Sequence, residues 1–186
     1  MTELPFFVYG TLRPGEHNHD LFLRGRTAAE EPARLPGALL YDGPGYPYLV
    51  RDAGPGEVTG ELEEVAGELV SAAPGEYAAL LSVLDALEEY LGPGHPLNLY
   101  EREVCDVRRT RDGRMVRAWV YVAAPAARLG RPIAGGDWLS RRSLEPGRPR
   151  LRERLGGEPR LREEPRLRGE PRLREEPRLR DVPRTP

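Results

Sequence analysis

Glu88 is a carboxylate that falls where the sequence predicts a buried helix face. The segment Tyr77–Leu91 repeats apolar residues at the spacing of an amphipathic helix. At about 100° per residue, Glu88 falls about 40° from Leu84, inside the apolar stripe, whereas Glu89 falls on the solvent side. Burial raises the pKa of a carboxyl group, which suits it to proton transfer near neutral pH. The alternative is that Glu88 reaches solvent at the helix end or pairs with an arginine.

The loop after the first predicted strand is a second candidate. Pro5–Tyr9 is a short apolar run, typical of a buried strand, and it leads into Gly10 within the sequence YGTLRPG. A glycine at this point lets the backbone turn sharply and present N–H groups to a carboxylate or a developing oxyanion. Taken alone, the pattern favours the alternative that the strand simply leads into an ordinary loop.

The remaining reactive residue types do not form convincing sites. His17, His19 and His95 have no carboxylate or cysteine partner at clear ligand spacing, so we expect no metal ion. The single cysteine, Cys105, excludes an internal disulfide and is expected to be an inert buried thiol. All 28 basic residues are arginine, which excludes lysine Schiff-base chemistry.

Strands joined by Gly/Pro turns surround the one convincing helix. A short helix is predicted around His17–Arg24, and the Asp112-Gly113 pair indicates a hairpin. Besides Pro5–Tyr9, the predicted strands are Ala33–Tyr41, Tyr48–Arg51, Gly56–Val65, Glu101–Arg109 and Arg114–Val122. This pattern predicts an α+β domain with a curled sheet.

The C-terminal part of the 186-residue chain differs in composition from the rest. From Glu158 the unit EPRLR occurs four times, and from Pro159 to Pro183 proline recurs every six residues. Proline at this spacing prevents a continuous helix, and one leucine per repeat cannot form a core. We therefore predict one domain at residues 1–144 and a disordered Pro/Arg/Glu hexapeptide-repeat tail at residues 145–186.

Charge and hydropathy exclude several classes of protein. The tail is mildly basic, but acidic residues alternate with its arginines and no aromatic residue is present to stack on bases. We therefore expect no nucleic-acid partner, while contact of the tail with an unknown partner stays open. No apolar run is long enough to span a membrane, and the acidic N-terminus is unlike a signal peptide. These features predict a cytoplasmic protein without membrane contact.

Short blocks that follow one another along the chain carry a family resemblance. They are Phe7–Arg13, Asn18–His19, Tyr46–Val50, Val58–Leu62, Leu84–Glu88, Tyr100–Arg102, Ala118–Tyr121 and Gly136–Trp138. In this order the blocks resemble the γ-glutamylcyclotransferase-like superfamily, and they cover the chain from about Phe6 to Trp138. The sequence YGTLR, in place of YGSL, favours the branch that contains γ-glutamylamine cyclotransferase and AIG2-like proteins.

The resemblance implies a fold and a reaction. The fold is a small mixed β-barrel with flanking helices. In the reaction, the α-amine of a γ-glutamyl amine or peptide attacks the γ-carbonyl of the same molecule, releasing 5-oxoproline and a free amine. The enzyme would thus be an amide-cleaving carbon–nitrogen lyase or acyltransferase. Its partner would be this small-molecule substrate, and the reaction needs no metal or other cofactor.

The resemblance also implies roles for individual residues. Glu88 matches the family's catalytic glutamate and would act as general base and then as general acid. The residues expected to bind substrate are Tyr9, Gly10, Thr11, Leu12, Arg13 and Tyr121. Within this set, the backbone of residues 10–12 would hold the substrate carboxylate or the oxyanion, and Tyr9 would contact the glutamyl head. Arg13 would pair with a carboxylate or point to solvent, and Tyr121 is either a pocket or a core residue.

Two departures from the family pattern leave an alternative open. Glu89 stands where a small residue usually follows the catalytic glutamate, and Leu91–Pro96 lengthens the loop beside the site. The longer loop would either reshape the pocket for another amine or close it. A closed pocket would favour a non-catalytic AIG2-like module that binds a small metabolite or serves in interactions. A third interpretation places the function in the tail.

Overall fold

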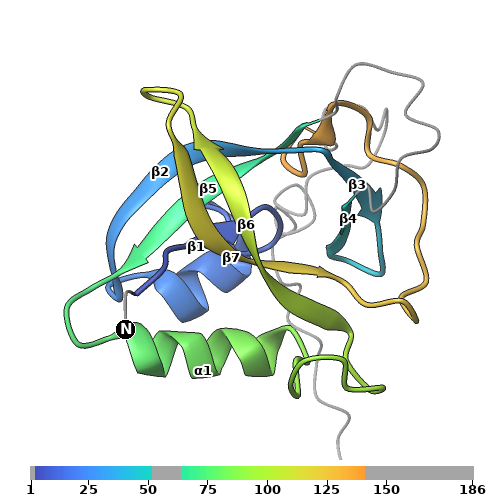
Figure 1. The fold of residues 1–186 in the computed structure, drawn as a ribbon, viewed down its shortest axis with the longest axis horizontal. Helices are drawn as coiled ribbons and strands as arrows, with labels where there is room; N and C mark the ends of the chain where they lie inside the picture. The colour runs from blue at the N-terminus through green and yellow to red at the C-terminus, as the bar shows by residue number, and fades with distance from the viewer. Residues whose placement is uncertain (1–2, 52–63, 141–186) are drawn as a thin grey trace, which may run out of the picture. The chain divides into compact units, whose positions relative to one another are not determined.

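Five strands pair into a closed barrel in the order β1-β5-β2-β6-β7 (Figure 1). The computed structural model describes residues 3–51 and 64–140, and all structural statements concern these residues. The barrel strands are β1 (Phe6–Val8), β2 (Thr27–Pro36), β5 (Glu64–Ala72), β6 (Tyr100–Arg109) and β7 (Met115–Ala123). Neighbouring strands are antiparallel except β1 and β7, whose parallel contact closes the barrel. The predicted α+β class with a small mixed barrel is confirmed.

The other elements lie around this barrel. β3 (Ala38–Asp42) and β4 (Pro47–Arg51) form a two-stranded antiparallel sheet. The helix α1 (Tyr77–Leu87) runs beside the barrel and contacts η1 (His19–Leu23), a turn of π-helix (Figure 1). A 3-10 turn, η2 (Ala134–Gly136), follows β7.

β1 is apolar at every position because both of its faces are buried. Successive strand residues point to opposite sides. Phe7 packs with residues of the other barrel strands, whereas Phe6 and Val8 pack in a second cluster with Leu80 and Leu84 of α1. β1 thus links the barrel interior to α1, the helix that Glu88 follows.

Several predicted strand boundaries differ from the structure. The predicted strand Ala33–Tyr41 is two strands, because Gly37 adopts a φ of 67° and turns the chain between β2 and β3. Most of the predicted strand Gly56–Val65 lies outside the described residues, and β5 begins only at Glu64. The predicted hairpin is present, with Gly113 at a φ of 69° between β6 and β7.

The helix α1 ends at Leu87 rather than at Leu91 as predicted. Glu89 adopts a φ of 51°, and the N–H of Tyr90 donates to the carbonyl of Asp85 at 2.9 Å. These are features of a Schellman motif, which closes a helix with a left-handed residue. As a result Leu91, expected on the apolar face, is 63% exposed.

Two further predictions from the sequence concern the C-terminal tail and contact with a membrane. The tail predicted at residues 145–186 lies outside the described residues, so its disorder stays a prediction. Within residues 3–51 and 64–140, no helix combines the length and apolar character needed to cross a membrane.

Candidate active site

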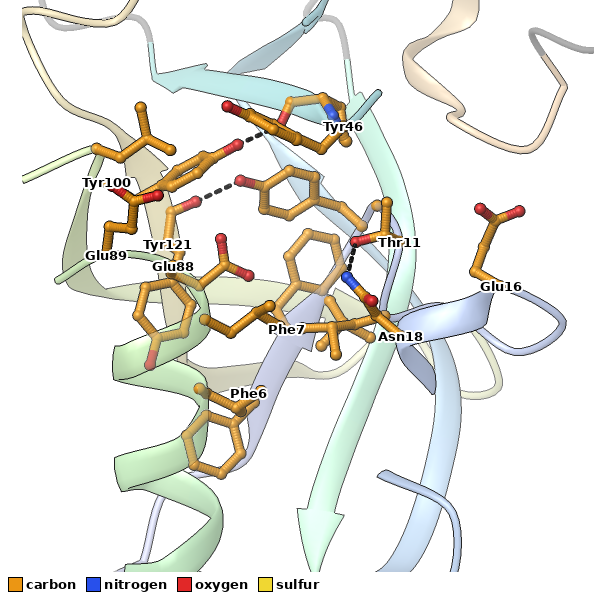
Figure 2. Close-up of a pocket in the computed structure, with 18 of the residues that line it drawn as sticks. Phe6, Phe7, Thr11, Glu16, Asn18, Tyr46, Glu88, Glu89, Tyr100 and Tyr121 are labelled. Carbon is orange, nitrogen blue, oxygen red and sulfur yellow. Dashed lines mark hydrogen bonds between the residues drawn. The ribbon is translucent and has the colours of Figure 1, made fainter. Parts of the chain in front are cut away.

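A cavity of about 380 Å³ lies between the C-terminal end of α1 and the loop that follows β1 (Figure 2). The turn before β4, the start of β6 and one residue of β7 complete its wall. A cavity of this size accommodates a small metabolite. The predicted site residues that line it are Tyr9, Gly10, Thr11, Leu12, Glu88 and Tyr121. Arg13, the remaining predicted site residue, does not line the cavity.

Glu88 is the first residue beyond α1, and its side chain points into the cavity (Figure 2). Its backbone N–H still donates to the carbonyl of Leu84 at 2.9 Å, so the residue keeps the angular position of a helical one. The side chain is half-buried, and removal of its carboxyl group from water raises the pKa of Glu88 from 4.5 to about 8. Such a group can accept and release a proton near neutral pH.

No cation stabilises the charged form of Glu88 within the described residues. Its carboxyl group forms no ion pair or hydrogen bond there, and desolvation alone accounts for its raised pKa. The alternative in which Glu88 pairs with an arginine is therefore not observed within the described residues.

Gly10, Thr11 and Leu12 of the loop after β1 line the same cavity. The N–H of Arg13 donates to the carbonyl of Gly10 at 3.1 Å and closes a turn. The side-chain amide of Asn18 donates to the hydroxyl of Thr11 at 3.0 Å and holds that turn. Among the described residues, the N–H groups of Gly10, Thr11 and Leu12 have no acceptor. Clustered N–H groups of this kind suit an anionic oxygen.

Gly10 is required for close packing rather than for an unusual backbone angle. Its φ is not positive, but a Cβ at this position would lie 2.7 Å from the side chain of Pro47. The glycine therefore lets the start of β4 approach the loop after β1. This approach brings Tyr46, next to Pro47, to the cavity wall.

Tyr9 and Tyr121 line the cavity, but their hydroxyl groups bond other parts of the protein. The hydroxyl of Tyr9 donates to the carbonyl of Tyr121 at 2.6 Å, and the hydroxyl of Tyr121 donates to Asp85 at 2.7 Å. Asp85 also accepts from Arg102 at 2.6 Å, and the guanidinium of Arg102 lies 4.7 and 4.9 Å from the centroids of two aromatic rings. These contacts tie the last turn of α1 to β6 and β7, and so hold Glu88 in place.

Arg13 is turned away from the cavity toward two protein carboxylates. Its guanidinium donates to both carboxylate oxygens of Glu68, at 2.8 and 2.9 Å, and also to Asp137. Arg13 and Glu68 are both buried. This bidentate pairing occupies the guanidinium, so the contact of Arg13 with substrate stays a prediction. In the structure Arg13 joins the loop after β1 to β5 and to the segment after η2.

Comparison with known proteins places the fold and the cavity in a family. The sequence model of the family described as "Gamma-glutamyl cyclotransferase, AIG2-like" matches residues 6–140. The chain belongs to this family. The matched range contains every residue that lines the cavity.

Individual relatives and solved structures cover the chain to different extents. The "Gamma-L-glutamyl-butirosin B gamma-glutamyl cyclotransferase" of Niallia circulans is 38% identical over 62% of this chain and 64% of its own length. A protein of Halalkalibacterium halodurans, provisionally named a gamma-glutamylcyclotransferase, is 35% identical over 63% of this chain and 91% of its own length. The crystal structure of YkqA from Bacillus subtilis is similar over 77% of this chain and 42% of YkqA, with 25% identity and a TM-score of 0.53. This chain therefore matches less than two thirds of the Niallia protein and less than half of YkqA.

The cyclotransferase-family cavity also has lining residues that sequence reasoning did not select. Tyr46 and Tyr100 lie within blocks that carried the resemblance, and this was the available signal for them. Glu89 also lines the cavity, although the helical period assigned it to solvent. The segment Leu91–Pro96 contributes no lining residue, so the described cavity is not closed by the lengthened loop.

Proposed function

We propose that this chain is a γ-glutamyl cyclotransferase that converts a γ-glutamyl amine or peptide into 5-oxoproline and a free amine. The observation that carries the proposal is the carboxyl group of Glu88. It lies in a cavity that Gly10–Leu12 also line, and burial raises its pKa to about 8. The names of the relatives support the general activity.

The γ-glutamyl head of such a substrate carries a carboxylate and an ammonium group. The N–H groups of Gly10, Thr11 and Leu12 would accept the carboxylate or the oxyanion that forms at the γ-carbonyl. The ammonium group would lie beside Glu88, whose carboxyl group is largely removed from water. Holding both ends of the substrate together removes much of the entropic barrier to ring closure.

One carboxyl group is sufficient for both proton transfers. Glu88, as carboxylate, takes a proton from the α-ammonium, and the free amine attacks the γ-carbonyl carbon to form the ring C–N bond. The tetrahedral intermediate then collapses, and the bond to the departing nitrogen breaks as Glu88 returns the proton to it. The ring nitrogen still carries one extra proton, which it loses as it becomes an amide, and the same carboxyl group passes this proton to the released amine, which leaves as an ammonium ion. Protons therefore balance over the cycle, and no covalent intermediate with the protein forms.

The test is release of 5-oxoproline and amine from a panel of γ-glutamyl amides by the full chain. Glu88→Gln keeps the shape of the side chain but cannot carry a proton, so we expect kcat to fall at least ~100-fold. Asp106→Asn is a matched control, because it removes one negative charge from an exposed position of β6 outside the cavity. We expect the control to retain wild-type activity.

Two results would contradict the proposal. Unchanged 5-oxoproline release by Glu88→Gln would exclude Glu88 as the proton carrier. No release by the wild-type chain across the panel would instead favour the non-catalytic module that binds a small metabolite.

A further inference from the structure

The pair Asn18-His19 has no role in the reaction proposed above, although it carried part of the family resemblance. Asn18 lines the cavity with Thr11, and its side-chain amide donates to the hydroxyl of Thr11 at 3.0 Å (Figure 2). The two residues are seven positions apart, and two turns closed by backbone hydrogen bonds fold the loop back between them. The side-chain hydrogen bond therefore joins the two ends of the loop at the cavity wall.

His19 fixes the position of Asn18. Its Nε2 atom lies 2.8 Å from one carboxylate oxygen of Glu30 in β2, and the other oxygen of Glu30 accepts the hydroxyl of Thr27 at 2.8 Å. Because a carboxylate only accepts, His19 donates from Nε2. His19 also begins the π-helical turn η1, which the N–H of Arg24 closes by donating to the carbonyl of His19 at 3.1 Å. Short π-helical segments are frequent at functional sites.

The hydrogen bond from Asn18 leaves the hydroxyl of Thr11 with one proton to donate. A hydroxyl group has two lone pairs that accept and one O–H that donates. The amide of Asn18 occupies a lone pair, and within the described residues no acceptor takes the proton of the Thr11 hydroxyl. Since Thr11 lines the cavity, this proton is available to an acceptor on a ligand. It adds a side-chain donor to the backbone N–H groups of the same loop.

The acceptor that suits this donor is the α-carboxylate of a γ-glutamyl substrate. Figure 2 shows Glu88 on one side of the cavity, and Thr11 with Asn18 on another. An α-carboxylate beside an ionised Glu88 would meet like charge, whereas the loop side offers neutral donors. Among the described residues that line the cavity none is an arginine, and the basic one, His17, is exposed. Neutral donors are therefore the main means of holding a carboxylate here, and each bonds a charged acceptor more strongly than a neutral one.

We propose that Asn18 is a positioning residue that aims the hydroxyl of Thr11 at the α-carboxylate of the substrate. Thr11 then contacts the substrate through its side chain as well as its backbone, and Asn18 acts through Thr11. This inference rests on the proposed cyclotransferase function for the identity of the ligand. The α-carboxylate is present in the bound substrate and in the transition state alike, so loss of the contact should raise KM and leave kcat largely unchanged.

The test compares two substrates that differ only in the α-carboxylate. γ-Glutamyl propylamide carries it and closes to 5-oxoproline, whereas 4-amino-N-propylbutanamide lacks it and closes to 2-pyrrolidinone; both release propylamine. Thr11→Val keeps the shape of the side chain but removes the hydroxyl. In the full chain we expect it to lower kcat/KM for γ-glutamyl propylamide at least about tenfold and to leave the carboxylate-free substrate within about twofold of wild type.

Variants of both residues extend this comparison. Asn18→Leu removes the donor to Thr11 and should show the same dependence on substrate, with a loss of about threefold to tenfold for γ-glutamyl propylamide. Asn18→Asp should cost more, since its carboxylate accepts the proton of the Thr11 hydroxyl and repels the substrate carboxylate. Thr11→Ser keeps the hydroxyl and should stay within about threefold of wild type. Thr110→Val is the matched control, because it removes a hydroxyl from an exposed residue outside the cavity, and it should change kcat/KM for neither substrate.

Equal losses for the two substrates in Thr11→Val would overturn the inference, because a general structural defect or a contact with the γ-carbonyl oxygen affects both alike. Wild-type kcat/KM for both substrates in Asn18→Leu would overturn it as well. In either case, turnover of γ-glutamyl propylamide by the wild-type chain would still uphold the cyclotransferase.

Binding of 5-oxoproline and 2-pyrrolidinone, measured by calorimetry, separates this inference from the proposed function because it needs no turnover. We expect Thr11→Val to raise Kd for 5-oxoproline at least about fivefold and Kd for 2-pyrrolidinone less than about twofold. This result would support the inference even if the wild-type chain cleaved no γ-glutamyl amide. An equal change in Kd for the two compounds, or no binding of 5-oxoproline to the wild-type chain, would overturn it.

Discussion

The carboxyl group of Glu88 connects the chemistry of the site to its energetic cost. A carboxylate in a cavity without a cationic partner is destabilised, which is what raises its pKa to about 8. The folded protein therefore holds a proton on Glu88 at pH values where the unfolded chain has lost it. A group held in this way is suited to proton transfer but reduces stability at high pH.

The sign of this effect gives a stability prediction. Because folding raises the pKa of Glu88 from 4.5 to about 8, its contribution to the free energy of unfolding is complete below the lower value and lost as pH rises through the higher one. Glu88→Gln does not titrate, so at pH 9 we expect it to be more stable than wild type by about 1–2 kcal/mol. This figure is below the full value of the shift, because the half-buried side chain faces a cavity that admits water.

Urea unfolding at pH 5 and pH 9 checks this prediction, with Asp106→Asn as the control for loss of one charge. The stability difference between Glu88→Gln and wild type should grow with pH. A difference that stayed constant, or that shrank with rising pH, would show that folding does not raise the pKa of Glu88.

At the scale of the elements, the end of α1 decides where both glutamates point. The N–H of Tyr90 donates to the carbonyl of Asp85, and the N–H of Glu89 donates to that of Ala86 at 3.4 Å. Together with the left-handed φ of Glu89, this is the hydrogen-bond pattern of a Schellman motif. The motif turns the chain immediately after Glu88, so that consecutive side chains both reach the cavity.

Glu89→Gly tests the energetic part of this description. Glycine adopts the left-handed conformation without a steric penalty, so we expect the free energy of unfolding to rise by about 0.5–1 kcal/mol. Glu89→Ala has a Cβ like glutamate and should give little gain. Thermal or urea unfolding of the two variants measures the difference, and equal stabilities would argue against a strained backbone at this position.

The sequence predicted the elements better than the ends of those elements. The helical period placed Glu88 on the buried face correctly, because its N–H continues the pattern of α1 through Leu84. It assigned Glu89 to solvent, because the period assumes that the helix continues. The split of one predicted strand at Gly37 was missed for a similar reason, since a positive φ cannot be distinguished from an ordinary strand glycine by pattern alone.

For the described molecule as a whole, the missed site residues depend on contacts between distant segments. Tyr46 and Tyr100 become neighbours, with ring centroids 6.4 Å apart, only because the start of β4 packs against the start of β6. Arg13 likewise pairs with Glu68 and Asp137, far along the chain. The local sequence pattern contains no information on such pairings. The order of the family blocks, in contrast, indicated the barrel fold and marked Glu88 as a candidate site residue.

The most direct test of the central claim is the pH dependence of kcat/KM for 5-oxoproline release by the full chain. If Glu88 must be ionised to accept the substrate's proton, log kcat/KM should rise with a slope of about one up to about pH 8. Above that pH the profile should level off and then decline as the ammonium group of the free substrate ionises. A profile that is flat from about pH 6 to 8, or that levels off near the ordinary pKa of 4.5, would contradict proton transfer by a buried Glu88.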